Sequence, residues 1–382
     1  MQLSCLVMHS ENKDLEIVVG LVQSVFLQLV RLGIGTSKDA KIPNGIDWKA
    51  LKALADEHGL SAIVLDGLNE VRSKKSDERS DWFPPQTMTL EWIGEVMQNY
   101  EARYKQYKKA VSSLAGCYNQ HGFKMMALKG YACSLDWPKP NHRPCGDIDI
   151  WQFGQYREAD STLVSEKNIK IDSSHHHHTV FYWQDFMVEN HYDFINVHHH
   201  KSNAAFEAIL KEQGKDDSQY VMVNGEKVYL PSPNLHALFL LKHACIEFAA
   251  SGLNMRQVLD WAFFVEKHGK EVDWGWLMKV LEEFGMKTMF NAINGVCVEN
   301  LGFSSSIFPN VQCYQVIKER VLNEILFPNI SNDKPKRLLS RILWKYKRWK
   351  ANEWKHKLCY NESMWSAFCS GIWSHLLKPS SI

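Results

Sequence analysis

Apolar side chains recur at helical spacing near the start of the chain. Within residues 14–34 they lie three or four positions apart, which places them on one face of a helix: Ile17, Leu21, Val25, Leu29 and Leu32. A second helix is predicted to begin after Asp47, a good N-cap residue, and to end near His58, where Gly59 suits a C-cap. The same pattern recurs at Asp273-Trp274, with Gly285 closing it, so we predict two helical modules with the same caps.

The centre of the chain mixes helical and strand-like patterns. A charged segment, 71–87, ends in two prolines and is predicted to be a loop, and a long helix is expected from about 90 to 120. Short apolar or alternating runs predict strands, and an amphipathic run between them predicts a helix. The predicted strands are 124–128, 146–151, 178–183 and 186–198, and the helix is 155–168.

Beyond Pro231 the pattern is helical almost to the end of the chain. The expected helices are 233–250, 253–268, 273–284, 286–300, 311–326 and 335–375. The sequence therefore predicts an α+β protein with a mixed β-sheet core, a helical N-terminal region and a helical C-terminal domain. We place the three parts at 1–88, 89–230 and 231–382.

Composition and charge narrow the class of protein. The 44 basic side chains balance 43 acidic ones, so the net charge indicates no polyanionic partner. The nine cysteines form no CxxC pair, which argues against a zinc ribbon or a disulfide framework and favours a reduced, cytoplasmic setting. A signal peptide is not expected, and the most apolar stretch, 17–32, is too short and too polar for a transmembrane segment.

Two carboxylates alternate with β-branched residues in Gly146-Asp147-Ile148-Asp149-Ile150. On a strand, the two aspartates project from one face while the isoleucines pack on the other. Such close like charges repel each other, and a cation relieves the repulsion. Carboxylate oxygens suit Mg²⁺, which proteins hold with one or two carboxylates and substrate phosphates. Taken alone, the pattern also fits a solvated acidic strand.

A turn upstream of this strand, Leu128-Lys129-Gly130, favours the metal site over the solvated strand. Backbone N–H groups of a helix beginning after Gly130 would bind phosphate oxygens, aided by the helix dipole, and glycine allows a close approach. Lys129 would neutralise a phosphate as a point charge. The combination predicts a phosphate site beside a metal site.

From Leu128-Lys129-Gly130 through Arg143 to the Gly-Asp-Ile-Asp strand, the chain resembles nucleotidyltransferases of the DNA polymerase β type. It resembles more closely a family of uncharacterised nucleotidyltransferases that is common in bacterial genomes. The resemblance extends over about residues 16–300. It also includes the Asp47-Trp48 helix, the strand Val188-Glu189-Asn190-His191 and a helix pair containing Arg256 and Asp260.

The resemblance implies a nucleotidyltransferase-type sheet and an activity that depends on Mg²⁺ or Mn²⁺. Asp147 and Asp149 would hold one or two ions. Glu189 is expected to be the third carboxylate, a metal ligand that also activates the acceptor hydroxyl, and Asp193, on the same face of the strand, is the alternative. The residues expected to bind the nucleotide are Lys129, Gly130, Arg143 and Gly146.

Two arginines near these motifs allow two interpretations each. Arg143 either contacts the triphosphate or pairs with Asp147. Arg256 and Asp260 have the i, i+4 spacing of a helix ion pair, so Arg256 either fixes the C-terminal helices together or faces the nucleotide.

Two histidine runs, 175–178 and 198–200, indicate a rival chemistry. Imidazole is the commonest metal ligand, but neighbours on a strand alternate faces, so a run of four cannot all ligate one ion. We expect structural or solvated histidines, with a transition-metal site as the alternative. His178 and His191 flank the proposed active-site strands and are the expected contacts to substrate or phosphate.

The segment 334–357 is basic, with interleaved tryptophans and Tyr346. Such a helix either binds nucleic acid or an anionic surface, or packs its tryptophans on the domain with its lysines in water.

The sequence as a whole predicts a Mg²⁺-dependent nucleotidyltransferase. It would move a nucleoside monophosphate from an NTP, expected to be ATP, to an acceptor hydroxyl and release pyrophosphate. The acceptor stays open among RNA, protein, a sugar and a small molecule. The alternative is a catalytically silent nucleotide- or partner-binding module, because Tyr131 follows the turn glycine and the loop to Asp147 is long. A metal-sensing protein built on the histidines is a third hypothesis.

Overall fold

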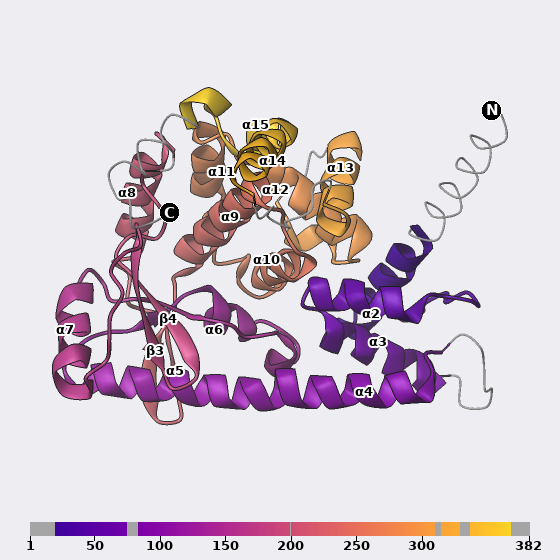
Figure 1. The fold of residues 1–382 in the computed structure, drawn as a ribbon, viewed down its shortest axis with the longest axis horizontal. Helices are drawn as coiled ribbons and strands as arrows, with labels where there is room; N and C mark the ends of the chain where they lie inside the picture. The colour runs from indigo at the N-terminus through magenta and orange to yellow at the C-terminus, as the bar shows by residue number, and fades with distance from the viewer. Residues whose placement is uncertain (1–19, 75–82, 199, 310–314, 329–336, 368–382) are drawn as a thin grey trace.

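The computed structural model describes residues 20–74, 83–198, 200–309, 315–328 and 337–367. Helices surround a six-stranded mixed sheet, so the predicted α+β class with a mixed β-sheet core is confirmed (Figure 1). No helix among the described residues is both long enough and apolar enough to cross a membrane.

The N-terminal region is helical, as predicted. Residues 20–33 form a helix, and α2 (Trp48–Glu57) begins where the Asp47 side chain accepts a hydrogen bond from the Ala50 N–H. Gly59 ends it with a positive φ of 66°. The predicted loop at 71–87 is partly wrong, because α3 (Ser61–Lys74) includes its first residues, and 75–82 lie outside the described residues.

A long continuous helix forms the base of the molecule in Figure 1. It consists of α4 (Gln86–Val96), a π-helical turn (Met97–Ala102) and α5 (Arg103–Gln120). It begins directly after Pro84-Pro85, four residues before the predicted start at 90. The α5 end packs against the sheet through buried side chains that include Tyr107, Val111 and Leu114.

The sheet has the strand order β3-β4-β2-β1-β6-β5. The strands are β1 (Met126–Ala127), β2 (Ile148–Trp151), β3 (His178–Trp183), β4 (Phe186–His191), β5 (Tyr220–Val223) and β6 (Glu226–Tyr229). β2 is central, antiparallel to β1 and parallel to β4. The strand predicted at 186–198 ends at His191, and the β5–β6 hairpin, which turns at Asn224-Gly225, was not predicted.

The two faces of the sheet have different surroundings. Ile148 and Ile150 point toward α5 and α7 (Tyr156–Lys167), in a hydrophobic cluster that also contains Ala159 and Leu163. The opposite face carries Asp149 and faces α9 (Pro233–Ala250) and α10 (Met255–His268) across a cavity. The predicted alternation of carboxylates and isoleucines therefore separates a wet face from a packed face.

Further helices complete the fold. They are α6 (Lys129–Ser134), α8 (Asn203–Gln213), α11 (Trp274–Glu283), α12 (Lys287–Gly295), α13 (Gln315–Leu326), α14 (Leu338–Ala351) and α15 (Glu353–Cys359). Short turns lie at Pro140–His142, Val296–Asn300 and Ser305–Ile307. α11 repeats the cap of α2, since Asp273 accepts from the Trp276 N–H. The helix predicted at 335–375 is instead split at Asn352 and followed by extended backbone at Tyr360.

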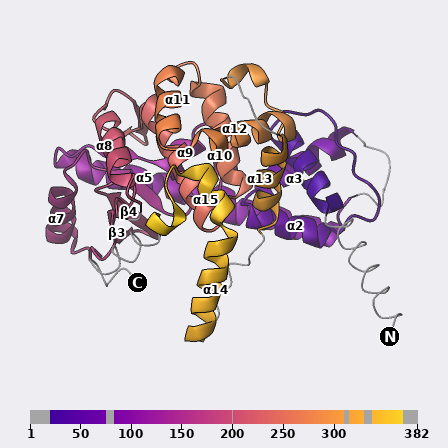
Figure 2. The same ribbon diagram turned by 90° about the horizontal axis from the view of Figure 1, so that it is seen from above.

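The basic segment contributes partly to packing. Trp354 packs edge-on against Phe248, and the guanidinium of Arg320 lies 3.9 Å from its ring. Lys355 is buried and pairs with Glu324 at 2.5 Å, which fixes α15 to α13. α14 extends away from the body of the molecule (Figure 2). Residues 334–336 lie outside the described part, and nucleic-acid or anionic-surface contact stays a prediction.

Two hydrophobic clusters hold the fold together. One contains α5, α7 and the packed face of the sheet. The other joins the N-terminal helices to the C-terminal ones, from Val25 and Leu29 to Leu259 and Cys359. The C-terminal helices are therefore held against the rest of the chain, and the cavity lies between firmly packed walls.

Candidate functional site

The residues singled out in the sequence converge on one cavity of about 790 Å³ between the sheet, α9 and α10. Every predicted site residue lines it except Asp193: Lys129, Gly130, Arg143, Gly146, Asp147, Asp149, His178, Glu189, His191 and Arg256. Because these residues come from distant parts of the chain, their convergence is a property of the fold.

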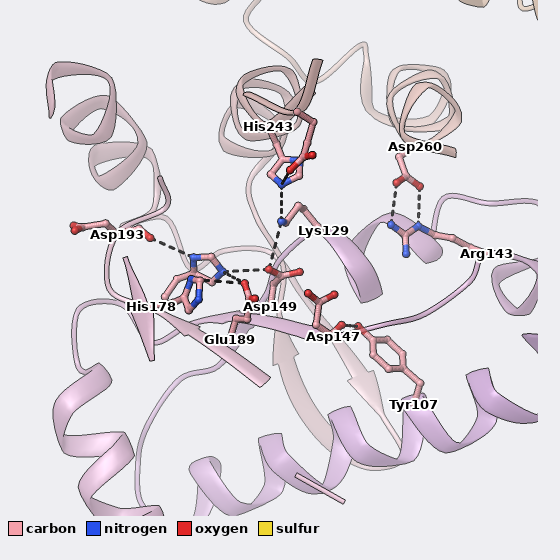
Figure 3. Close-up of polar contacts among 12 residues, drawn as sticks. Tyr107, Lys129, Arg143, Asp147, Asp149, His178, Glu189, Asp193, His243 and Asp260 are labelled. Carbon is pink, nitrogen blue, oxygen red and sulfur yellow. Dashed lines mark hydrogen bonds and ion pairs between the residues drawn. The ribbon is translucent and has the colours of Figure 1, made fainter. Parts of the chain in front are cut away.

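Three carboxylates form one wall of the cavity. Asp149 on β2 and Glu189 on β4 are direct partners in the parallel register, and both side chains lie on the cavity face (Figure 3). Asp147 immediately precedes β2, and its backbone carbonyl accepts a 2.9 Å hydrogen bond from the Tyr107 hydroxyl. Strand alternation and register thus bring the three predicted carboxylates together.

Basic neighbours balance the charge of Asp149, which is only 4% exposed. Burial by itself raises the pKa of this carboxyl, but Lys129 at 3.4 Å and His191 at 3.1 Å outweigh burial and hold the pKa well below its ordinary value. For Glu189, burial and the charge of Asp149 raise the pKa. Burial also opposes the charge of Lys129, yet the carboxylates raise its pKa.

Both ring nitrogens of His191 face oxygen acceptors. Nε2 lies 3.1 Å from Asp149 Oδ1, and Nδ1 lies 3.2 Å from the backbone oxygen of Asp193. A neutral imidazole can donate from only one nitrogen. A second proton on the ring or a cation at Nε2 satisfies both nitrogens, and ligand atoms of Asp149, Glu189 and His191 lie within 4.8 Å of one another. The residues present therefore fit a divalent metal ion.

Asp193 does not join the carboxylate cluster. The prediction that it shares a strand face with Glu189 is wrong, because β4 ends at His191 and the chain bends. Its carboxylate pairs with Lys211 on α8 instead, and Figure 3 shows the side chain pointing away from the cavity. Only its backbone oxygen serves the site, as the acceptor for His191.

The turn at Gly130 is shaped by packing. A Cβ atom at this position would lie 2.6 Å from the Tyr107 hydroxyl oxygen, so glycine lets α6 sit against that group. Tyr131 points into the cluster beneath the sheet, close to Tyr107, and does not block the turn. α6 has only six residues, so the expected aid from its dipole is small. Lys129 also donates to Nε2 of His243 on α9 at 3.0 Å.

Arg143 pairs with Asp260, so its predicted pairing with Asp147 is wrong. Nε and one terminal nitrogen lie 2.7 and 2.9 Å from the two carboxylate oxygens of Asp260. Burial opposes the charge, but Asp260 raises the pKa of Arg143. Trp137 donates to the same carboxylate at 2.8 Å, which fixes the long loop between Gly130 and Asp147 to α10.

Arg256 is left without the ion pair that its spacing predicted, because the described partner of Asp260 is Arg143. Its Nε is buried and has no hydrogen-bond partner among the described residues. Burial and the charge of Arg143 lower its pKa. A buried, incompletely bonded guanidinium at a cavity wall is suited to an anion.

Several polar residues at the cavity were not among the predicted site residues, including His177, His243 and Asn254. His177 belongs to the histidine run, but its position on the cavity wall comes from its place just before β3. His243 and Asn254 lie on α9 and at the N-cap of α10, facing the sheet. Burial lowers the pKa of His177 to about 2 and those of His178 and His243 to about 3, so all three are neutral at pH 7.

Comparison with known proteins identifies the family of this chain. A model of a family described as uncharacterised nucleotidyltransferases matches residues 44–302, and the chain belongs to that family. No curated protein matches the chain. A solved structure of an antigenic nucleotidyltransferase-like protein from Paracoccidioides brasiliensis is 17% identical and covers 42% of this chain and 75% of its own, with a TM-score of 0.31.

Proposed function

We propose that the protein is a divalent-metal-dependent nucleotidyltransferase that moves a nucleoside monophosphate from an NTP to an acceptor hydroxyl and releases pyrophosphate. The observation that carries the proposal is the carboxylate wall, in which Asp149 and Glu189 are register partners and Asp147 lines the same cavity. Asp147, Asp149 and Glu189 would hold Mg²⁺ or Mn²⁺. When bound, such ions stabilise the attacking and leaving oxygens of an in-line displacement.

The other side chains have separate parts in the proposal. Glu189 has a raised pKa and is suited to accept the proton of the acceptor hydroxyl. Lys129 neutralises Asp149 in the structure and would turn to a phosphate oxygen of the NTP. Arg256, with its buried Nε, is the second phosphate ligand. Arg143 would act through Asp260, by fixing the loop that leads into Asp147, rather than through the triphosphate.

The alternative of a catalytically silent module rested on Tyr131 and the long loop. Tyr131 is buried beneath the sheet, and the loop is fixed to α10 through Trp137 and Arg143. Neither feature obstructs the carboxylates, which supports a catalytically active protein over a silent module. ATP is the proposed donor, and the acceptor class is left to experiment.

The test is transfer of label from each NTP in cell extract with Mg²⁺. We expect one NTP to label one class of acceptor. Asp147→Ala should reduce the rate at least ~100-fold, because several kcal/mol of charge stabilisation would be lost. Asp185→Ala, at an exposed hairpin position, is the matched control and should transfer normally. Undiminished transfer by folded Asp147→Ala would overturn the proposal, and Mg²⁺-dependent NTP binding without any labelling would favour the silent module.

A further inference from the structure

The histidines beside the carboxylates form a second group of side chains whose spacing could hold a metal ion. His178 is the first residue of β3 and is the register partner of His191, the last residue of β4. His177 precedes the strand, so strand alternation does not turn it to the other face. Its ring centroid lies 4.3 Å from that of His178 and 5.6 Å from that of His191. Consecutive histidines therefore converge on one point at the strand ends.

Two nitrogens in this group have no hydrogen-bond partner in the part of the chain that the structure describes. Nδ1 of His177 and Nδ1 of His178 are both buried and unbonded among the described residues, and His178 is only 6% exposed. Buried polar atoms in native proteins are normally paired, so an orphaned pair at a cavity wall requires an explanation. A ring nitrogen from each of His177, His178 and His191 lies within 4.8 Å of the other two.

We propose that His177, His178 and His191 bind one divalent transition-metal ion of the Zn²⁺ class, next to the carboxylate site. Imidazole nitrogens favour such ions over Mg²⁺, which prefers oxygen. Nitrogens bound to one tetrahedral Zn²⁺ at about 2.1 Å are ~3.4 Å apart, so binding would require ring rotations that bring the three nitrogens closer together. Glu189 Oε2, 3.7 Å from His178 Nδ1 and 3.6 Å from His191 Nε2, is suited to be the fourth ligand, and the other oxygen of Glu189 stays available to the carboxylate site.

The surroundings of His191 support this assignment. Donation from Nδ1 to the backbone oxygen of Asp193 would leave Nε2 as the ligand atom, and hydrogen bonds of this kind orient metal-bound imidazoles. The ion would link the ends of β3 and β4 at the cavity wall. Because His191 also contacts Asp149, the histidine site adjoins the proposed catalytic ions directly.

The test is Co²⁺ titration of the full-length chain, purified without a polyhistidine tag and stripped with a chelator. We expect one equivalent to bind with the intense visible bands of a four-coordinate, nitrogen-ligated ion. Zn²⁺ should displace it, and millimolar Mg²⁺ should not. His177→Gln and His178→Gln should each weaken Co²⁺ binding at least ~tenfold, as loss of a ligand requires. His198→Gln, an exposed member of the other run, should bind normally.

The outcomes separate this inference from the proposed nucleotidyl transfer. Absent bands, displacement by Mg²⁺, or unchanged binding by His177→Gln would overturn the metal site whether or not the protein transfers nucleotides. His177 lies outside the strand, so this variant decides the question if His178→Gln does not fold. If the wild-type protein and Asp147→Ala both show the Co²⁺ bands but the wild-type protein transfers no nucleotide from any NTP, the proposed function is wrong and the metal site stands.

Discussion

Single side chains in this protein are used in ways that their sequence spacing does not reveal. Arg256 and Asp260 have the spacing of a helix ion pair, yet Asp260 binds Arg143, which lies more than a hundred positions away. The pair is almost fully buried, with both side chains at most 7% exposed. Its two partners connect the loop before the carboxylate strand to α10, so the pair sets the position of Asp147 from outside the metal site.

Removing one partner of this pair should be costly. Asp260→Ala leaves the Arg143 charge buried without compensation and should lower the free energy of unfolding by about 3–5 kcal/mol. Urea unfolding followed by circular dichroism measures the loss. Arg157→Ala, which removes an exposed arginine on α7, is the control and should change the value by less than ~0.5 kcal/mol. A loss below ~1 kcal/mol in Asp260→Ala would contradict the structural role.

At the scale of elements, the site depends on how closely α6 approaches α5. Gly130 lies against the hydroxyl of Tyr107, and that hydroxyl also donates to the carbonyl of Asp147. One tyrosine therefore sets both the turn that carries Lys129 and the residue that begins the carboxylate wall. The contact between α6 and the Tyr107 hydroxyl requires glycine at position 130, because any other residue would add a Cβ atom there.

A double-mutant cycle tests this contact. Gly130→Ala places a Cβ 2.6 Å from the Tyr107 hydroxyl oxygen and should destabilise the fold by about 1–3 kcal/mol. Tyr107→Phe removes that oxygen, after which the nearest ring carbon is 3.7 Å away, so the glycine substitution should cost much less in that background. Thermal or urea unfolding of the four proteins gives the coupling. Strictly additive losses would show that the hydroxyl is not the obstacle.

Strand patterns were the most predictable part of the sequence, and long-range partners the least. Alternation at 146–150 predicted correctly which side Asp147 and Asp149 face, because two-residue periodicity follows from strand geometry. The same reasoning was wrong for Asp193, because the end of β4 depends on sheet pairing. The partners of Arg143 and the convergence of His177 with His191 come from tertiary packing, which no local pattern encodes.

At the scale of the whole molecule, the cavity is shared between the sheet and the C-terminal helices. Two buried histidines, His58 and His236, pack against Phe26 and Phe264 of the cluster that includes these helices. Burial lowers the pKa of His58 and of His236 to about 4. Both are neutral in the folded protein at neutral pH, and they take up protons when the chain unfolds below the ordinary histidine pKa of 6.5.

This difference makes stability depend on pH. The free energy of unfolding is not reduced by these two histidines above pH 6.5. It falls as the pH drops from 6.5 toward 4, because the unfolded chain then binds more protons than the folded chain. Each such histidine contributes a slope of up to about 1.4 kcal/mol per pH unit. Urea unfolding between pH 7.5 and 4.5 should show the fall, and His236→Gln should flatten it. An equally steep fall in that variant would show that His236 is already charged in the folded state.

The central claim is that the carboxylate wall catalyses nucleotidyl transfer. The most direct measurement compares ATP labelled at the α-phosphate with ATP labelled at the γ-phosphate, using purified protein, Mg²⁺ and the acceptor fraction identified in extract. The account predicts that the α label enters the acceptor, that the γ label leaves as pyrophosphate, and that Asp149→Asn abolishes both events. Transfer of the γ label, or α-label transfer that persists in folded Asp149→Asn, would contradict it.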